Sequence, residues 1–189
     1  MPLSEPSYER ERFHNRTVEC FGYRRADGLW DIEGHMVDTK TYAFHNKARG
    51  RIAPGDAIHN MWIRLTLDDA FEIKAIEAVT DDAPFPICGG ITPNFQRIVG
   101  LKVTGGWMRE VKQRLGGVHG CTHLVELLGP MATVAFQTIY PGRERLAREA
   151  GRPSEASKTR PRIINSCHAL SSDGPVVKDH WPQWYTGQE

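Results

Sequence analysis

The sequence predicts an α+β fold in which an antiparallel four-stranded sheet, made of two hairpins, is followed by three helices. Residues 17–37 alternate in polarity around Ala26-Asp27-Gly28, and residues 58–80 alternate around an Asp-Asp-Ala turn at 68–70. Helical spacing and helix-stopping glycines take over after residue 90. A block of strands followed by a block of helices favours this class over a doubly wound parallel sheet. The glycine-rich phosphate loops GxGxxG and GxxxxGK[ST] do not occur in the sequence.

Alternation along the predicted strands assigns side chains to faces. In the first hairpin, one face carries Trp30, Ile32 and Met36. The opposite face carries Leu29, Asp31, Glu33, His35 and Val37, with Asp38 just beyond. In the second hairpin, the apolar face carries His59, Met61, Ile63, Leu65 and Leu67. Residues 45–56 contain Gly50, Pro54 and Gly55 and are predicted to form a loop.

Three helices are expected in the second half. Thr92 and Pro93 are typical of a helix start, which predicts a short helix over 93–101. A second helix would end at Gly116-Gly117. The third and most apolar helix starts near Cys121, with a break or kink at Gly129-Pro130.

Length and composition predict a single domain over 1–189. Residues 1–15 are expected to be a mobile lead-in. Residues 142–162 hold seven Lys or Arg against three Glu and are expected to form a flexible basic linker. Residues 163–189, with strand-like Ile163 and Ile164, are expected to return and pack on the core.

Charge and hydropathy exclude two classes of partner, nucleic acids and membranes. Lys and Arg number 24 and Asp and Glu 23, so no nucleic-acid partner is expected. No apolar run approaches the roughly 20 residues of a membrane span, and the polar N-terminal residues lack a signal-peptide pattern. These features predict a cytoplasmic protein without a membrane partner, whose four cysteines are thiols or ligands. A homodimer is left open.

The pair Cys121 and His123 is the strongest chemical candidate. Both lie at the start of the apolar helix, where free amides and the helix dipole favour a thiolate, and the two could also ligate one metal. The alternative is a small buried cysteine beside a capping histidine. Cys88 lies in a Pro/Gly loop and is a second candidate ligand, whereas Cys20 is interpreted as core.

The strand histidines supply further candidates. His35 shares a face with Asp31 and Glu33, which is a spacing able to hold a metal or share a proton, or an ordinary solvated face. His59 lies on an apolar face and is either a core histidine or a substrate contact. The predicted substrate-binding residues are His59, Trp62 and Arg64. Cys167 and His168 could act together only if their strand bends.

Four segments carry a family resemblance. They are YRRADGLWDIEGHMVDTK, IHNMWIRLTLDD, LGGVHGCTHLVELLGPMATVAFQT and CHALSSDGPVV, and they resemble the bacterial family called domain of unknown function 2889 over roughly residues 14–187. Such proteins accompany genes of aromatic-acid and acyl-CoA catabolism, which implies an accessory enzyme for such compounds. A fainter likeness is to NifU-like iron–sulfur scaffolds. Cys88 and Cys121, with His123, occupy places similar to those of the ligand cysteines in such scaffolds. This sequence lacks the cysteine that the scaffolds have in the loop before the third strand, and His59 or Asp56 stands near that place.

Three functions follow as hypotheses. The first is a hydrolase or lyase for an aromatic or acyl substrate, including an acyl-CoA thioester, with Cys121, His123 and His35 as catalytic residues. Its site would work with or without a divalent metal, zinc or iron, held by Cys88, Cys121 and His123. The second is a metal or iron–sulfur carrier, and the third is a ligand-binding module without chemistry.

Overall fold

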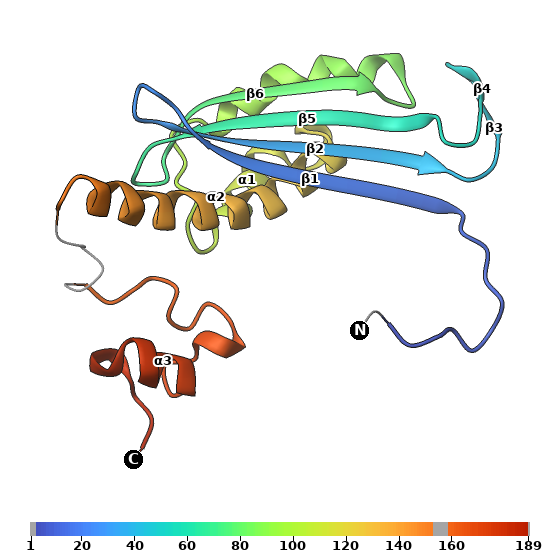
Figure 1. Cartoon of the computed structure of the whole chain (residues 1–189). Helices are drawn as coiled ribbons and strands as arrows, with labels where there is room; N and C mark the ends of the chain where they lie inside the picture. Colours follow the sequence, from blue (N-terminus) through green and yellow to red (C-terminus); the bar gives the residue numbers. More distant parts are fainter. Residues whose placement is uncertain (1–2, 153–158, 189) are drawn as a thin grey trace. The chain divides into compact units, whose positions relative to one another are not determined.

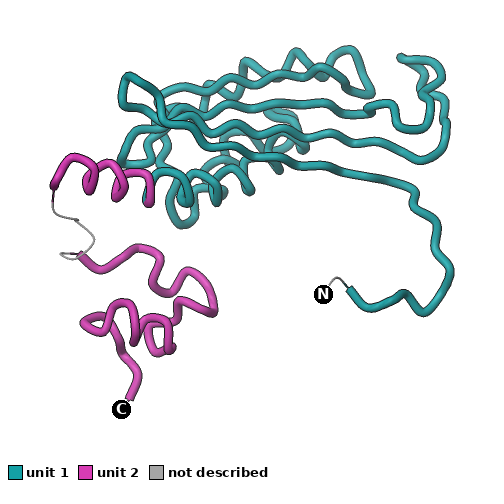
Figure 2. Tube along the Cα trace, viewed as in Figure 1, with its two compact units in different colours: residues 1–140 teal, residues 141–189 magenta. Residues whose placement is uncertain are grey.

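The computed structural model describes residues 3–152 and 159–188. It divides the chain into two compact units, Met1–Tyr140 and Pro141–Glu189 (Figure 2). Each unit is described by itself below.

The first unit is built on a four-stranded antiparallel sheet in the order β1-β2-β5-β6. Its strands are β1 (His14–Arg24), β2 (Trp30–Lys40), β5 (Ala57–Leu67) and β6 (Ile73–Asp82). The predicted α+β class and both predicted hairpins are confirmed. In the first turn Gly28 has φ 89°, and the Asp27 carboxylate accepts a hydrogen bond from the Leu29 amide. This combination explains why Asp-Gly closes the hairpin.

A second, two-stranded sheet interrupts the connection between the hairpins. It consists of β3 (Phe44–Asn46) and β4 (Gly50–Ile52), where the sequence predicts only a loop. The Asn46 side chain accepts hydrogen bonds from the amides of Ala48 and Arg49, and Gly50 has φ 74°. These local bonds make a tight turn that the spacing of glycine and proline alone does not reveal.

Helical segments follow the sheet. They are η1 (Pro86–Ile98), a run of 3-10 turns, then α1 (Trp107–Leu115), η2 (Gly117–His119) and α2 (Thr122–Glu149). Of the expected break or kink at Gly129-Pro130, the break is wrong, because α2 is continuous there. A residue before proline normally avoids helix because its Cβ meets the proline ring, and glycine has no Cβ. The first short helix also begins earlier than expected, at Pro86.

The core lies between one face of the sheet and the helices, and Figure 1 shows α1 and α2 on the same side of the sheet. Buried side chains of β2 and β5 meet those of α2, including Ile32, Met36, Leu127 and Met131. The packing is close at Gly34, where an added Cβ would lie 2.6 Å from the Met131 sulfur and 3.0 Å from Leu127. The absence of a side chain at Gly34 therefore lets α2 approach β2. This face is called the helix face below, and the opposite one the open face.

Among its described residues, the second unit contains the end of α2, two 3-10 turns and one short helix. These are η4 (His168–Leu170), α3 (Pro175–His180) and η5 (Pro182–Trp184). Ile163 and Ile164 form turns rather than the expected strand. The Asn165 amide bonds to the Leu170 carbonyl, and the amides of Ile164 and Ser166 bond within three residues. Local hydrogen bonds thus take the place of a strand ladder.

The structure describes only part of the segment 142–162, which is expected to be a flexible basic linker. Residues 142–149 belong to α2, and residues 153–158 lie outside the described residues. That 163–189 packs on the core stays a prediction. Within residues 3–152 and 159–188, no helix has both the length and the apolar character needed to cross a membrane.

Candidate functional site

The candidate site is centred on Asp38, near the end of β2. Asp38 lies on the helix face with Trp30, Ile32 and Met36, and its side chain is 1% exposed. It is the only buried charged side chain among the described residues. A buried carboxylate needs compensating partners, because removing its charge from water costs several kcal/mol. Those partners define the site.

Strand register brings three of the partners to Asp38. Arg16 on β1 and His59 on β5 are the residues directly opposite it, so both share its face. His14 lies two residues before Arg16 and again faces the same side. The pairing of β2 with β5 shifts between Asp38 and Thr39, which leaves Ile58 without a direct partner. Such bulges re-aim side chains at the ends of strands and are common beside active sites.

Both carboxylate oxygens of Asp38 accept hydrogen bonds. Arg16 donates from Nε to Oδ1 at 2.8 Å and from Nη2 to Oδ2 at 2.9 Å. His14 Nε2 lies 3.0 Å from Oδ1, and His59 Nδ1 lies 2.9 Å from Oδ2. The bidentate guanidinium fixes the plane of the carboxylate, which leaves Oδ2 directed toward His59.

The start of α2 delivers the fourth residue. The Cys121 carbonyl accepts the Val125 amide hydrogen bond, so Cys121 caps α2, and His123 lies in the first turn. His123 Nε2 is 3.9 Å from Asp38 Oδ2, and its ring centroid is 3.7 Å from that of His59. On the other side of the ring, His123 Nδ1 is 4.0 Å from Cys121 Sγ. The Arg16 guanidinium also bonds to Glu126 of α2 at 2.6 Å, which ties β1 to the helix beside the site.

Electrostatics fix the protonation states of two of these groups. Burial opposes ionisation of Asp38, but hydrogen bonds from Arg16, His14 and His59 and the positive charge of Arg16 outweigh it and lower the pKa to about 2. Burial and the nearby charge of His123 lower the pKa of His59, although Asp38 acts in the opposite sense. At neutral pH the site therefore presents a carboxylate beside a neutral imidazole.

These residues have the donor set of a mononuclear metal site. One ligand atom each from Asp38, His59 and His123 lies within 4.8 Å of the other two. Ligands about 2.0–2.1 Å from a tetrahedral ion stand about 3.3 Å apart, and the two distances from Asp38 Oδ2, 2.9 and 3.9 Å, bracket that value. Two histidines and one carboxylate suit zinc or iron(II). Binding would replace the proton between Asp38 and His59 by the ion.

The predicted catalytic residue His35 lies elsewhere. It projects from the open face of β2, where its ring stacks on Trp62 at 3.6 Å and its Nε2 lies 2.8 Å from Asn60 Oδ1. The structure brings together Cys121 and His123, but it does not bring His35 to them, because α2 packs on the other face. Asp38, expected just beyond the residues that share a face with His35, lies on the helix face. Side chains alternate along a strand, so Asp38 is on the same face as Ile32 and Met36, which lie an even number of residues before it.

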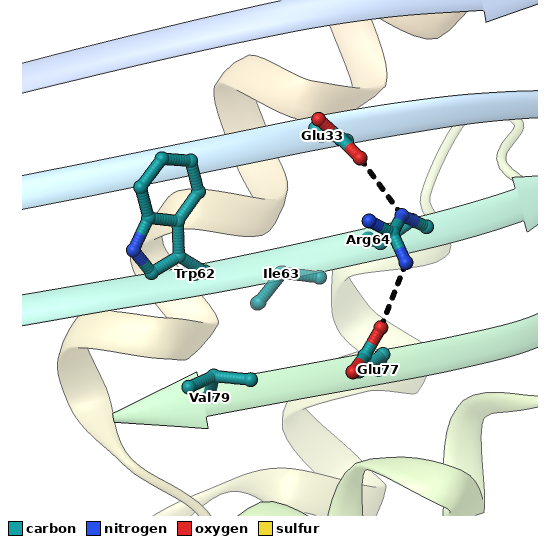
Figure 3. A pocket seen from close by; sticks show the side chains of 6 residues that line it. All are labelled: Glu33, Trp62, Ile63, Arg64, Glu77 and Val79. Atoms are coloured by element: carbon teal, nitrogen blue, oxygen red, sulfur yellow. Dashed lines mark hydrogen bonds and ion pairs between the residues drawn. The ribbon is translucent and has the colours of Figure 1, made fainter. Parts of the chain in front are cut away.

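The predicted substrate-binding residues are divided between the two faces. His59 belongs to the helix face and the site around Asp38. Trp62 and Arg64 belong to the open face, where they line a shallow pocket with Glu33, Glu77 and Val79 (Figure 3). Arg64 bonds to Glu33 at 2.8 Å and Glu77 at 2.9 Å, so its charge is neutralised within the sheet.

The remaining cysteines have separate environments. Cys88 lies in η1 and is not among the three residues whose ligand atoms converge, so its role as a ligand stays a prediction. Cys20 packs against the core, as expected, and burial raises the pKa of its thiol. Cys167 is exposed. Iron–sulfur clusters are held mainly by cysteine thiolates. The converging group has none, so the iron–sulfur carrier gains no support from it.

Sequence reasoning missed Asp38, Arg16 and His14 as site residues. His14 fell within the expected lead-in, but β1 begins at this residue. A signal for Asp38 was available, since a carboxylate that continues an apolar stripe at i, i+2 spacing must be buried and paired. No comparable signal marked Arg16, because only the register of β1 against β2 places it opposite Asp38.

Comparison with known proteins identifies a family for this chain. No curated protein and no solved structure matches this chain. A family described as "Protein of unknown function (DUF2889)" matches residues 14–137, which span the whole sheet, η1, α1 and the first half of α2. The matched segment thus holds all of the residues around Asp38, and the expected resemblance is confirmed over residues 14–137 of the expected 14–187: the chain belongs to the DUF2889 family.

Proposed function

We propose that this protein is an enzyme that hydrolyses a small acyl or aromatic substrate at a single divalent metal ion held by Asp38, His59 and His123. The observation that carries the proposal is the convergence of these three ligand atoms around a buried carboxylate. Catalytic metal sites keep three protein ligands and leave a position for water or substrate. A neutral His59 at working pH favours ligation, because imidazole binds metals in its deprotonated form.

The surrounding residues support the ligands. Arg16 and His14 both bond to Asp38 Oδ1 and so hold the carboxylate while Oδ2 faces the histidines. Partners of this kind orient ligands and typically change metal affinity by 10–100-fold. A bound metal would polarise a carbonyl and lower the pKa of its water, which is the chemistry that ester or thioester hydrolysis needs. The acyl or aromatic substrate class is supported by the family resemblance alone.

Metal content and chelation test this proposal. Purified protein should retain about one equivalent of zinc or iron by elemental analysis, and the chelated protein should take up one equivalent of either metal. Hydrolysis of a panel of aryl esters and acyl-CoA thioesters should disappear on chelation and return with the metal. A protein that binds neither zinc nor iron(II) at micromolar concentration would refute the metal centre. A metal-loaded protein without hydrolysis across the panel would refute the reaction.

A second candidate rests on a different contact. Cys121 Sγ, His123 and Asp38 lie in series, with Sγ 4.0 Å from Nδ1 and Nε2 3.9 Å from Oδ2. In this scheme His123 removes the thiol proton, the thiolate attacks the acyl carbon, and the leaving group takes that proton. Water then hydrolyses the acyl-enzyme and restores the thiol. Both candidates use His123 Nε2, so they exclude each other in one turnover.

The variant Cys121→Ser separates the two candidates. The metal centre predicts that this variant binds metal normally and keeps most of its hydrolysis, since Cys121 is no ligand. The thiol mechanism predicts loss of hydrolysis in this variant. Cys167→Ser is the matched control, because this thiol is exposed and belongs to the second unit.

A further inference from the structure

The two edges of the four-stranded sheet differ in how they are protected. Along β6, η1 runs beside the strand, and the Gln96 side-chain amide donates to the Ile76 carbonyl at 2.6 Å (Figure 1). Residues 100–103 add main-chain bonds at the start of β6. The Ile73 amide donates to Leu101, and the Gly100 amide donates to Ile73. This edge is therefore covered by the chain itself.

Strand β1 forms the other edge, and among the described residues of its unit β2 is the only strand that pairs with it. It has eleven residues, pairs with β2 without a register shift, and is exposed at every position except Cys20. It contains neither proline nor lysine, the residues that most often protect natural edges. Instead it exposes Val18, Phe21 and Tyr23. A long, regular edge with exposed apolar side chains is a template for pairing with another strand.

The sequence of β1 is compatible with pairing to itself. A two-fold axis normal to the sheet keeps each side chain on its own face. Directly opposite residues of an antiparallel pair also share a face, so the axis must pass midway between the two copies of one residue. An axis at Glu19 would place two carboxylates opposite each other. An axis at Cys20 would place Arg16 opposite Arg24. An axis at Phe21 avoids both clashes.

That register also supplies favourable pairs. Phe21 projects from the open face, and the rings of its two copies would lie opposite each other. Glu19 would lie opposite Tyr23 and diagonal to Arg25 of the second copy. Aromatic pairs and opposite charges at these spacings each contribute about 0.2–1 kcal/mol. Main-chain hydrogen bonds across residues 18–24 would complete the junction.

We propose that β1 is a homodimer interface, in which a second copy of this chain adds its own β1 antiparallel with Phe21 at the two-fold axis. The result is one continuous eight-stranded sheet. The paired stretch ends at residue 18, so His14 and Arg16 lie beyond it and the site around Asp38 stays accessible. The dimer and the metal centre are therefore independent, and failure of one leaves the other standing.

Sedimentation equilibrium from about 5 to 500 μM tests the interface. The native protein should shift from monomer to dimer within this range, and Phe21→Lys should stay monomeric with an unchanged circular dichroism spectrum. Val79→Lys is the matched control, because Val79 is also on the open face and similarly exposed, at 37% against 45%, but lies on β6. A native monomer at 500 μM would overturn the proposal, and so would a Phe21→Lys dimer.

Engineered cysteines test the register. In the proposed dimer the two residues at position 21 are directly opposite, at a Cα separation of about 4.5–5.5 Å that a disulfide can span. The two residues at position 23 are offset by four residues, about 13 Å along the strand. Oxidised Phe21→Cys should therefore form covalent dimers well above the level of the oxidised native protein, and Tyr23→Cys should not. Equal cross-linking of both variants, or of neither, would overturn this register.

Discussion

The two faces of the four-stranded sheet carry similar side chains in different environments. On the helix face, Asp38 is buried and its oxygens are bonded to Arg16, His14 and His59. On the open face, Arg64 is 47% exposed and bridges Glu33 and Glu77. Each face thus has at least one carboxylate, one arginine and one histidine, with His35 on the open face. Only the helix face removes its carboxylate from water.

This difference determines what each cluster can do. Water screens the open-face ion pairs, so they contribute little to stability. The buried carboxylate depends on its partners, and they hold the pKa of Asp38 near 2 while the pKa of His59 is lowered. Strongly perturbed groups that converge are typical of functional sites. Chemistry is therefore expected on the helix face, and the four predictions below test that contrast.

Metal affinity should show the largest contrast between the faces. His59→Ala removes a proposed ligand and should weaken zinc binding by at least 100-fold in competition with a chromogenic chelator. His35→Ala, on the same strand pair but the open face, should change the affinity by less than 3-fold. Equal losses in both variants would contradict the assignment of the site to the helix face.

Stability should respond strongly to the loss of Arg16. Arg16→Gln leaves the Asp38 carboxylate buried with two hydrogen bonds fewer, and such a loss should lower the free energy of unfolding by about 2–3 kcal/mol. Urea denaturation of the metal-free protein at pH 7 measures this change. The double variant Arg16→Gln with Asp38→Asn should recover part of the loss, because it removes the uncompensated charge.

Acid should destabilise the metal-free protein through the same cluster. Asp38 has an ordinary pKa of 3.8 when unfolded and about 2 when folded, so the unfolded chain binds the proton first as the pH falls. The stabilisation is complete above about pH 4 and lost as the pH approaches 2, a difference of about 2 kcal/mol. The lowered pKa of His59 acts in the same direction below pH 6.5. Urea midpoints of Asp38→Asn should be flatter than those of the native protein between pH 4 and 2; parallel curves would contradict this coupling.

Local patterns predicted much of the fold. Alternation found both hairpins, and the stripe containing Met61, Ile63 and Leu65 placed His59 on the apolar face. Cys121 and His123 were placed correctly at the start of α2, because a glycine-rich turn preceded the apolar run. Each of these inferences uses residues near one another in the chain.

The centre of the site needed long-range information. Asp38, Arg16 and His59 meet only because β2 pairs with β1 on one side and β5 on the other. Residue spacing does not fix strand register, and the bulge beside Asp38 shifts it by one residue. The open-face residues His35, Trp62 and Arg64 were selected for their chemistry. Their side chains alternate away from His59, so they could not join it.

The smallest effect is expected from the open-face arginine. Arg64→Gln breaks two exposed ion pairs, with Glu33 and Glu77, but leaves both carboxylates in contact with water. The free energy of unfolding should therefore fall by less than 1 kcal/mol, and the difference from the native protein should shrink further in 1 M NaCl. Arg16→Gln is the matched substitution on the helix face and should keep most of its effect in salt, because the Asp38 side chain is 1% exposed. If both arginines cost the same at low and high salt, burial of Asp38 would not distinguish the two faces.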